Sequence, residues 1–405
     1  MQDKNYKGRL FIIFSIVLID LIGFGIVIPL LPIYAESYGA RPFIIGLLGI
    51  SYSVTQLLFN PIWGAISDRV GRRPILLMSL FGAITFYTLF GWAPSLMWLF
   101  IARAGAGVFA ANISTAMAYI SDITTRENRT KGMGLIGAAF GLGFIIGPAV
   151  GGYLSQYSYS LPGYGAACLS LIAFTVAFFK LPETVKKKEN VVLQKMNPMN
   201  FIRPIGESLK NKALISPMLV FFLVTFAFSA MQIIFPLFTM KIFGFDVKEN
   251  GYLFAFSGFI AILFQGGIIG RLSKKFGEGV LAVFGTFLMA VGMAMLPFAT
   301  HLTMLLLALA IMSVGMGLSS PSLNSLISLN ASEEEQGSVI GVSRSVSTLA
   351  RILGPLWGGW SFGAFGFQWP FYTSGFVLFA AIFVGWPMLH AKASTIKTET
   401  VTVRS

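Results

Sequence analysis

The stretch GAISDRVGRRPILL, residues 64–77, decides the fold because it places a dense group of charges between two long apolar runs. Its charged residues and glycines are Gly64, Asp68, Arg69, Gly71, Arg72 and Arg73. The flanking runs, residues 42–63 and 74–92, are nearly free of charge, and each is long enough to cross a bilayer. A short charged loop between two such spans is typical of a polytopic membrane protein.

The composition supports a membrane protein. Hydrophobic residues make up 55% of the chain and charged residues 11%, against about 25% in soluble domains. The net charge of +13 would suit a nucleic-acid partner, but the bases lie in short loops between apolar runs, so we expect none. The single cysteine, Cys168, excludes an internal disulfide, and the two histidines, His301 and His390, lie near span ends. With these few thiols and imidazoles we expect no metal site and no cofactor. The sequence has no phosphate-binding P-loop, so we expect no direct use of ATP.

The apolar segments predict an all-α membrane protein with twelve transmembrane helices. The runs are continuous rather than alternating, which excludes barrel strands. They cover about 9–35, 42–66, 74–93, 96–121, 131–155, 161–181, 213–241, 248–272, 279–299, 302–328, 337–361 and 370–390.

Orientation follows from the distribution of Lys and Arg. Of the 29 bases, 23 fall on the side of the N-terminus, and three lie within spans. Only Arg41, Lys241 and Lys248 fall on the opposite side. Positive charge accumulates in the cytoplasm, so we expect both termini there, with the chain in an inner or plasma membrane.

Two matched halves are visible in the sequence. GAISDRVG at 64–71 returns as GRLSKKFG at 270–277, and FIIGPAVGG at 144–152 returns as RILGPLWGG at 351–359. Repeats at nearly one offset predict two six-helix bundles of the same orientation around a central cavity, the architecture of a carrier. The expected units are a bundle at 1–181, a cytoplasmic linker at 182–212, a bundle at 213–390 and a cytoplasmic tail at 391–405. We expect a monomer.

The charged loop resembles the G-x-x-x-D-R-x-G-R-R/K motif that joins the second and third helices of the major facilitator superfamily. In that family the loop latches the first half to the eleventh helix and to an acid that ends the fourth. The resemblance therefore implies a gating role for Gly64, Asp68, Arg69, Gly71, Arg72, Arg73 and Asp122. On residue chemistry alone, the arginines also anchor the loop on the cytoplasmic side.

The fifth span carries a second motif, GLGFIIGPAVGG at 141–152. Its pattern G-x-x-x-G-P-x-x-G-G resembles the fifth-helix motif of drug:proton antiporters, which favours export. The alternative interpretation is close packing of small residues between membrane helices, since the eleventh span has a similar LGPLWGG. The residues concerned are Gly143, Gly147, Pro148, Gly151 and Gly152.

Four charges lie well inside spans: Asp20, Arg103, Arg344 and Arg351. Charges there are costly and mark functional sites by default. Of these four residues Asp20 alone is an acid, so we predict that it carries a coupling proton. The alternative is a structural ion pair with Arg103. By resemblance to the family's fourth-helix R-x-x-x-G pattern, Arg103 modulates the proton affinity.

Arg344 and Arg351 are seven residues apart, so they share a helix face. We expect this pair either to line the cavity, contacting an anionic substrate or counter-ion, or to bind carbonyls where the halves meet. Three amides complete the predicted substrate site, with interhelical hydrogen bonds as the alternative. They are Gln232, Asn112 and Asn324.

Three stretches, two of which overlap the motifs above, resemble the tetracycline-efflux branch of the twelve-span drug:proton antiporters: VLIDLIGFGIVIPLLP, ISDRVGRRPILL and GAAFGLGFIIGP. Charges that this branch carries in its third, eighth and ninth spans fall here on Phe86, Ala261 and Met289. We therefore hypothesise proton-coupled export of small amphipathic or lipophilic compounds by alternating access, with a small molecule, protons and the bilayer as partners. The alternatives are a transporter of amphiphilic lipids or anionic metabolites and a non-transporting sensor. We expect no enzyme, because no nucleophile–base set is present.

Overall fold

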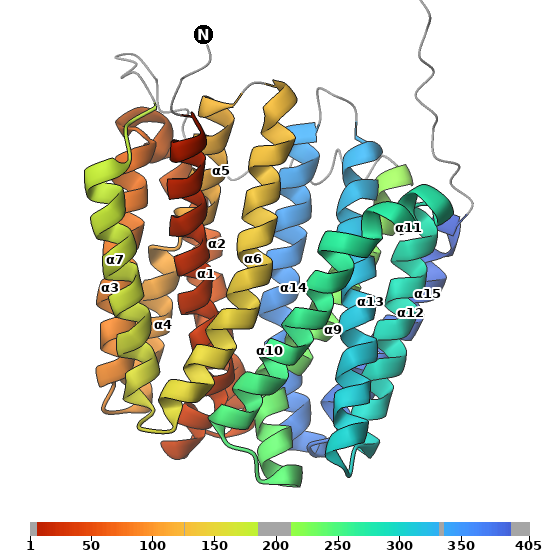
Figure 1. Ribbon diagram of the computed structural model, residues 1–405. Helices are drawn as coiled ribbons and strands as arrows, with labels where there is room; N and C mark the ends of the chain where they lie inside the picture. The colour runs from red at the N-terminus through yellow and green to blue at the C-terminus, as the bar shows by residue number, and fades with distance from the viewer. Residues whose placement is uncertain (1–5, 125, 185–211, 332–335, 390–405) are drawn as a thin grey trace, which may run out of the picture.

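The computed structural model describes residues 6–124, 126–184, 212–331 and 336–389, and within these ranges the ordered elements are helices (Figure 1). Most of the predicted linker at 182–212, and the predicted tail at 391–405, lie outside the described residues. The division into two domains therefore stays a prediction.

The twelve predicted spans are confirmed as helices. Helices α1 to α7, here called the N-half, are α1 (Tyr6–Ser37), α2 (Pro42–Val70), α3 (Arg72–Trp92), α4 (Leu96–Val108), α5 (Asn112–Ile123), α6 (Arg126–Ser155) and α7 (Ser160–Lys180). Helices α9 to α15, the C-half, are α9 (Lys212–Phe243), α10 (Val247–Leu263), α11 (Ile269–Phe276), α12 (Glu278–Met295), α13 (Leu302–Leu329), α14 (Gln336–Phe365) and α15 (Trp369–Gly385). The short turns are η1 (Phe264–Ile268), η2 (Leu296–Phe298) and η3 (Trp386–Leu389).

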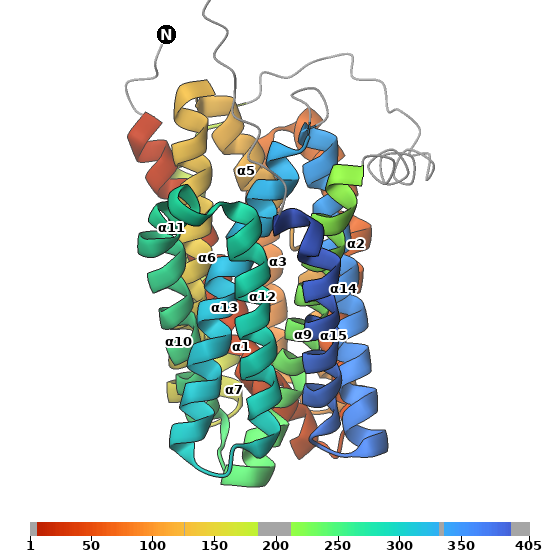
Figure 2. The same ribbon diagram turned by 90° about the vertical axis from the view of Figure 1, so that its right-hand side faces the viewer.

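Among the described residues, eleven spans are long and apolar enough to cross a membrane. The remaining predicted span, the eleventh along the chain, is helix α14. It has 30 residues and runs beside the others in Figures 1 and 2, but it is more polar because it carries Arg344 and Arg351.

The fourth span is broken, which the sequence did not predict. Helix α4 ends at Val108 and α5 begins at Asn112. Neighbouring helices satisfy the backbone groups that the break frees. Trp63 Nε1 on α2 donates to the Val108 carbonyl at 2.6 Å, and Ser79 Oγ on α3 accepts from the Ala111 amide at 3.2 Å. Such compensation is what makes irregular backbone tolerable at membrane depth.

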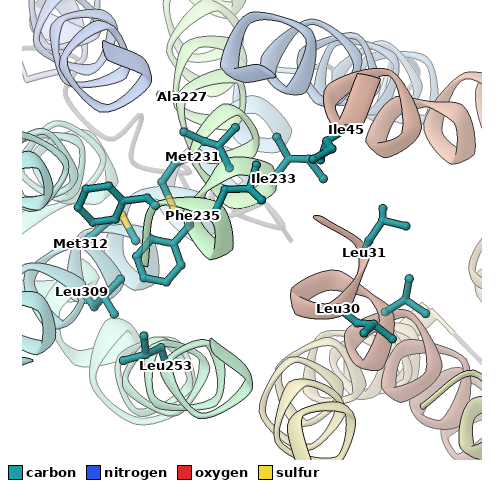
Figure 3. Packing of buried hydrophobic residues seen from close by; sticks show 14 of the residues in the cluster. Leu30, Leu31, Ile45, Ala227, Met231, Ile233, Phe235, Leu253, Leu309 and Met312 are labelled. Atoms are coloured by element: carbon teal, nitrogen blue, oxygen red, sulfur yellow. The ribbon is translucent and has the colours of Figure 1, made fainter. Parts of the chain in front are cut away.

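The two halves meet along two helix pairs, α6 with α10 and α2 with α14. Figure 1 shows α6 and α10 nearest each other in the lower half of the view and diverging upward, and Figure 2 shows α14 beside α2. One hydrophobic cluster continues from one half into the other. In Figure 3, Ile233 of α9 faces Ile45 of α2, with Leu30 and Leu31 of α1 close by.

Among the described residues, the backbones of the two halves approach closely at one end of the molecule. At the end of the α1–α2 connection, here called the closed end, a Cβ added at Gly46 on α2 would lie 2.5 Å from the Pro355 carbonyl oxygen on α14. At the end of the α2–α3 loop, here called the open end, a Cβ at Gly64 on α2 or at Gly341 on α14 would meet nothing within 4 Å. The same holds at this end for Gly137 on α6.

Candidate functional site

Three of the predicted gating residues form an ion-pair cluster at the open end. Arg72 Nη1 lies 2.5 Å from Asp68 Oδ1, and Arg72 Nε lies 3.1 Å from Asp122 Oδ2. Gly71, with a φ of 111°, makes the sharp turn that brings the arginine back over the end of α2. Left-handed φ values of this kind suit glycine. The Arg72 side chain is 13% exposed and Asp68 is 61% exposed, so the pair with Asp122 is the better shielded one.

The other loop residues surround this cluster. Arg73 Nη2 donates to the Phe178 carbonyl on α7 at 2.6 Å, and its guanidinium stands 5.8 Å from the centre of the Phe178 ring. Arg69 is half-buried in the last turn of α2. Gly64 lies further back on the same helix, in open space.

Glu183, directly after the sixth span, contacts the charged loop and is a residue of this site that the sequence analysis missed. Its two carboxylate oxygens accept from the backbone amides of Arg72 at 2.9 Å and Arg73 at 3.1 Å. An acid there satisfies otherwise free amides at the start of α3 and complements its dipole. Thr184 Oγ1 donates to Asp122 Oδ2 at 3.1 Å, which ties the same segment to the ion-pair cluster. An isolated acid after an apolar span was the available signal.

Asp20 on α1 is held by an amide. Asn112 Nδ2 donates to Asp20 Oδ1 at 3.0 Å, and the Asn112 side chain is 1% exposed. Asn112 is the first residue of α5, so the break in the fourth span is what places it against α1. This is the interhelical hydrogen bond given above as the alternative for Asn112, and its contact with a substrate stays a prediction. The structure shows no ion pair within 4 Å between Asp20 and Arg103, two residues that lie within the described ranges.

Arg103 on α4 is held by aromatic rings instead. It is 6% exposed, and its guanidinium lies 4.8 Å from the centre of the Tyr52 ring and 5.9 Å from that of Phe24. Arg103 Nε and Nη1 have no hydrogen-bond partner. Cation–π contact compensates a buried guanidinium only in part, and unpaired buried donors are costly. Two guanidinium nitrogens of Arg103 are therefore available to a further hydrogen-bond acceptor.

The glycines of the fifth-span motif pack α6 against α1. A Cβ added at Gly143, Gly147 or Gly151 would lie 2.6–2.7 Å from an α1 atom. The Pro148 ring also lies against α1, at Gly25, while its carbonyl and Gly152 face the C-half. A Cβ at Gly152 would lie 2.9 Å from the Lys248 carbonyl oxygen and 3.2 Å from Gly251 Cα, both on α10.

The second copy of the motif makes the equivalent contact. A Cβ at Gly359 on α14 would lie 3.2 Å from Gly46 Cα on α2. The Pro355 carbonyl lies against Gly46, just as the Pro148 carbonyl lies against Gly251. We call these two contacts, α6 with α10 and α14 with α2, the glycine seams. Both copies therefore pack across the halves at the closed end.

The remaining predicted substrate residues lie on three helices of the C-half. Arg344 and Arg351 on α14 are exposed, and Arg344 Nη2 reaches Met117 Sδ on α5 of the N-half at 3.1 Å. Gln232 on α9 is half-buried. Asn324 on α13 is exposed, and its Nδ2 donates to the Ser320 carbonyl at 2.9 Å.

The chain resembles known proteins over nearly its whole length. The sequence model of the Major Facilitator Superfamily matches residues 13–355 and 266–402. Tetracycline resistance protein, class E, of Escherichia coli is 32% identical over 85% of this chain and 88% of its own. Multidrug resistance protein 2 of Bacillus subtilis is 29% identical over 94% of this chain and 95% of its own.

The fold agrees with these relatives. The crystal structure of the human organic anion transporter MFSD10 (TETRAN) is 25% identical, with a TM-score of 0.73 over 95% of this chain and 100% of that one. The membrane-spanning helices, the charged loop after the second span and the family match agree with one another. The chain belongs to the Major Facilitator Superfamily and is a multi-pass membrane transporter.

Proposed function

We propose that the protein exports small amphipathic or lipophilic organic compounds in exchange for protons, by alternating access. The observation that carries this proposal is the pairing of Asp20 with Asn112 inside the membrane span, with Arg103 on the neighbouring α4. The drug-resistance proteins among its relatives support the direction of transport.

Asn112 can hold Asp20 in both protonation states. Its Nδ2 donates to the carboxylate, while its Oδ1 is buried without a partner. A protonated Asp20 has an O–H to donate, and Asn112 Oδ1 is the acceptor beside it. The ionised carboxylate keeps the N–H bond alone. The proton can thus be loaded and released without leaving Asp20 unpaired, and the unpaired donors of Arg103 tune that step.

Alternating access would use the two ends of the molecule in turn. The glycine seams and the bond between Tyr159 Oη and Asp246 Oδ1, 3.2 Å, hold the closed end. We propose that they separate when the open end closes and the loop that carries Asp68 and Arg72 latches onto the start of α14. Because Lys and Arg gather at the open end, this end and both termini are proposed to face the cytoplasm, with the protein in an inner or plasma membrane. We propose that the transporter works as a monomer.

The substrate differs from tetracycline in this proposal. Phe86 packs against Gly105 and the Phe109 ring, and Met289 is fully buried in the C-half. Neither position, nor Ala261, offers the charge that a metal–tetracycline chelate meets in the branch that this chain resembles. A lipophilic compound fits the apolar setting, with Gln232 and Asn324 as hydrogen-bonding partners.

A second candidate is an anionic metabolite or amphiphilic lipid. The exposed guanidinium groups of Arg344 and Arg351 favour it, and the solved relative named as an organic anion transporter supports it.

The test is proton movement in proteoliposomes with an imposed pH gradient, on addition of cationic, neutral and anionic compounds. We expect substrate-triggered proton release in the wild type and in Glu278→Gln, and none in Asp20→Asn. Loss of anion transport in Arg351→Ala would favour the second candidate. Transport that persists unchanged in Asp20→Asn would refute proton coupling through this residue.

A further inference from the structure

A cavity of about 410 Å³ lies at the open end, between the start of α1 and the end of α7. Its lining residues are Gly8, Arg9 and Ile12 at the start of α1, and Lys180 and Pro182 at the end of α7. Two of the five are cationic, and none is acidic. The volume lies in the range of small-molecule sites.

Positive charge alone does not define a site here, because loops on this side are rich in Lys and Arg throughout. What distinguishes Arg9 and Lys180 is that they line one concave space between two helices. A guanidinium has five N–H donors, so Arg9 can bind an anion beside any other partner. Lys180 is exposed and adds three more donors.

Two aromatic residues that adjoin the lining residues in sequence are strongly exposed. Phe11, next to Ile12, is 68% exposed, and Phe179, next to Lys180, is 78% exposed. In a membrane protein such rings contact lipid, and aromatic side chains are enriched where acyl chains meet headgroups. A ligand with a phosphate and an acyl tail would match the cations inside and the rings outside.

We propose that this cavity binds the phosphate headgroup of an anionic phospholipid from the leaflet at the open end. Basic pockets between membrane helices on the cytoplasmic side are typical lipid-headgroup sites. The cavity shares Pro182 with the gating segment, because the Pro182 carbonyl accepts from Tyr119 Oη at 2.9 Å and Glu183 follows directly. The bound lipid therefore lies against the segment that holds the start of α3.

The test is native mass spectrometry of the full chain, titrated with phosphatidylglycerol and, separately, with phosphatidylcholine. We expect preferential binding of phosphatidylglycerol, weakened about fivefold by Lys180→Gln and about 25-fold by Arg9→Gln with Lys180→Gln, at about 1 kcal/mol per charge. Lys275→Gln removes one charge at the same end of the molecule but outside the cavity, and should leave binding unchanged.

Two results would overturn the proposal. Equal weakening by Lys275→Gln would show attraction to the whole basic surface rather than a site. Displacement of phosphatidylglycerol by millimolar inorganic phosphate would assign the cavity to a free anion. Because no transport is measured, the outcome is independent of the proposed function.

Discussion

Adding one methyl group at a glycine seam should drive the protein out of the state described above. In Gly152→Ala the new Cβ would lie 2.9–3.2 Å from three backbone atoms of α10. Ordinary contact needs about 3.4 Å or more, and backbone cannot move aside as a flexible side chain can. The two helices must therefore separate by several tenths of an ångström.

Overpacking of this kind costs about 1–3 kcal/mol. The cost falls only on the state in which α6 and α10 touch at the closed end. A state that opens there escapes it, so the ratio of the two states should shift about 5- to 150-fold. The matching substitution Gly359→Ala, on the other seam, should shift it in the same direction.

Cysteine accessibility measures this shift. Ile233 is 9% exposed at the closed end, where its Cδ1 lies close to Gly49 of α2. With the single native cysteine removed by Cys168→Ser, Ile233→Cys can be labelled with a maleimide in nanodiscs. We expect faster labelling in Gly152→Ala, by up to the same factor.

The control lies on the same helix. A Cβ at Gly137 on α6 would meet nothing within 4 Å, so Gly137→Ala makes the same chemical change without the clash. Any general effect of replacing glycine in a helix is common to both variants. Labelling of Gly152→Ala at the rate of Gly137→Ala would refute the reasoning.

Three more predictions follow from individual contacts. Tyr159→Phe removes the hydrogen bond to Asp246 across the closed end, at a cost of about 0.5–1.5 kcal/mol, so closed-end labelling should rise about 2- to 12-fold; no change would mean that the bond does not hold the halves. Glu183→Gln weakens the cap on α3, so the Arg72 amide should exchange hydrogen faster and thermal unfolding should lose about 0.5–2 kcal/mol, whereas unchanged exchange would contradict the capping role. Asn112→Leu removes the amide N–H that Asp20 accepts from and the amide oxygen proposed to accept from protonated Asp20, so substrate-driven proton release should slow at least tenfold. Release at the wild-type rate would exclude the proposal that Asn112 holds Asp20 in both protonation states.

The span pattern was predictable because bilayer thickness fixes the length of an apolar run. The break in the fourth span was not, because VFAAN at 108–112 has no proline to announce it. The partners that stabilise the break, Trp63 and Ser79, come from other helices. The π turn η1 contains the pair Gly266-Gly267. Two adjacent glycines are compatible with an irregular helix but do not by themselves predict one.

The candidate site was predictable residue by residue but not as a set of contacts. Charges within spans stand out because of their cost, which identified Asp20 and Arg103. Because the two residues carry opposite charges, the sequence suggested an ion pair between them as the alternative to proton coupling. In the structure the rings of Phe24 and Tyr52 contact the arginine instead. The cap by Glu183 joins positions 111 residues apart, and nothing local in the sequence specifies such a pairing.

The glycine seams have a consequence for the origin of the fold. The fifth span of each half contacts the second span of the other, and Gly152 with Gly251 repeats as Gly359 with Gly46. This reciprocal arrangement, in which one surface meets its own copy, is the geometry of an isologous two-fold dimer interface. A single six-helix ancestor carrying one copy of the motif could therefore already have closed this end by pairing with itself, before fusion of two genes made the partner permanent.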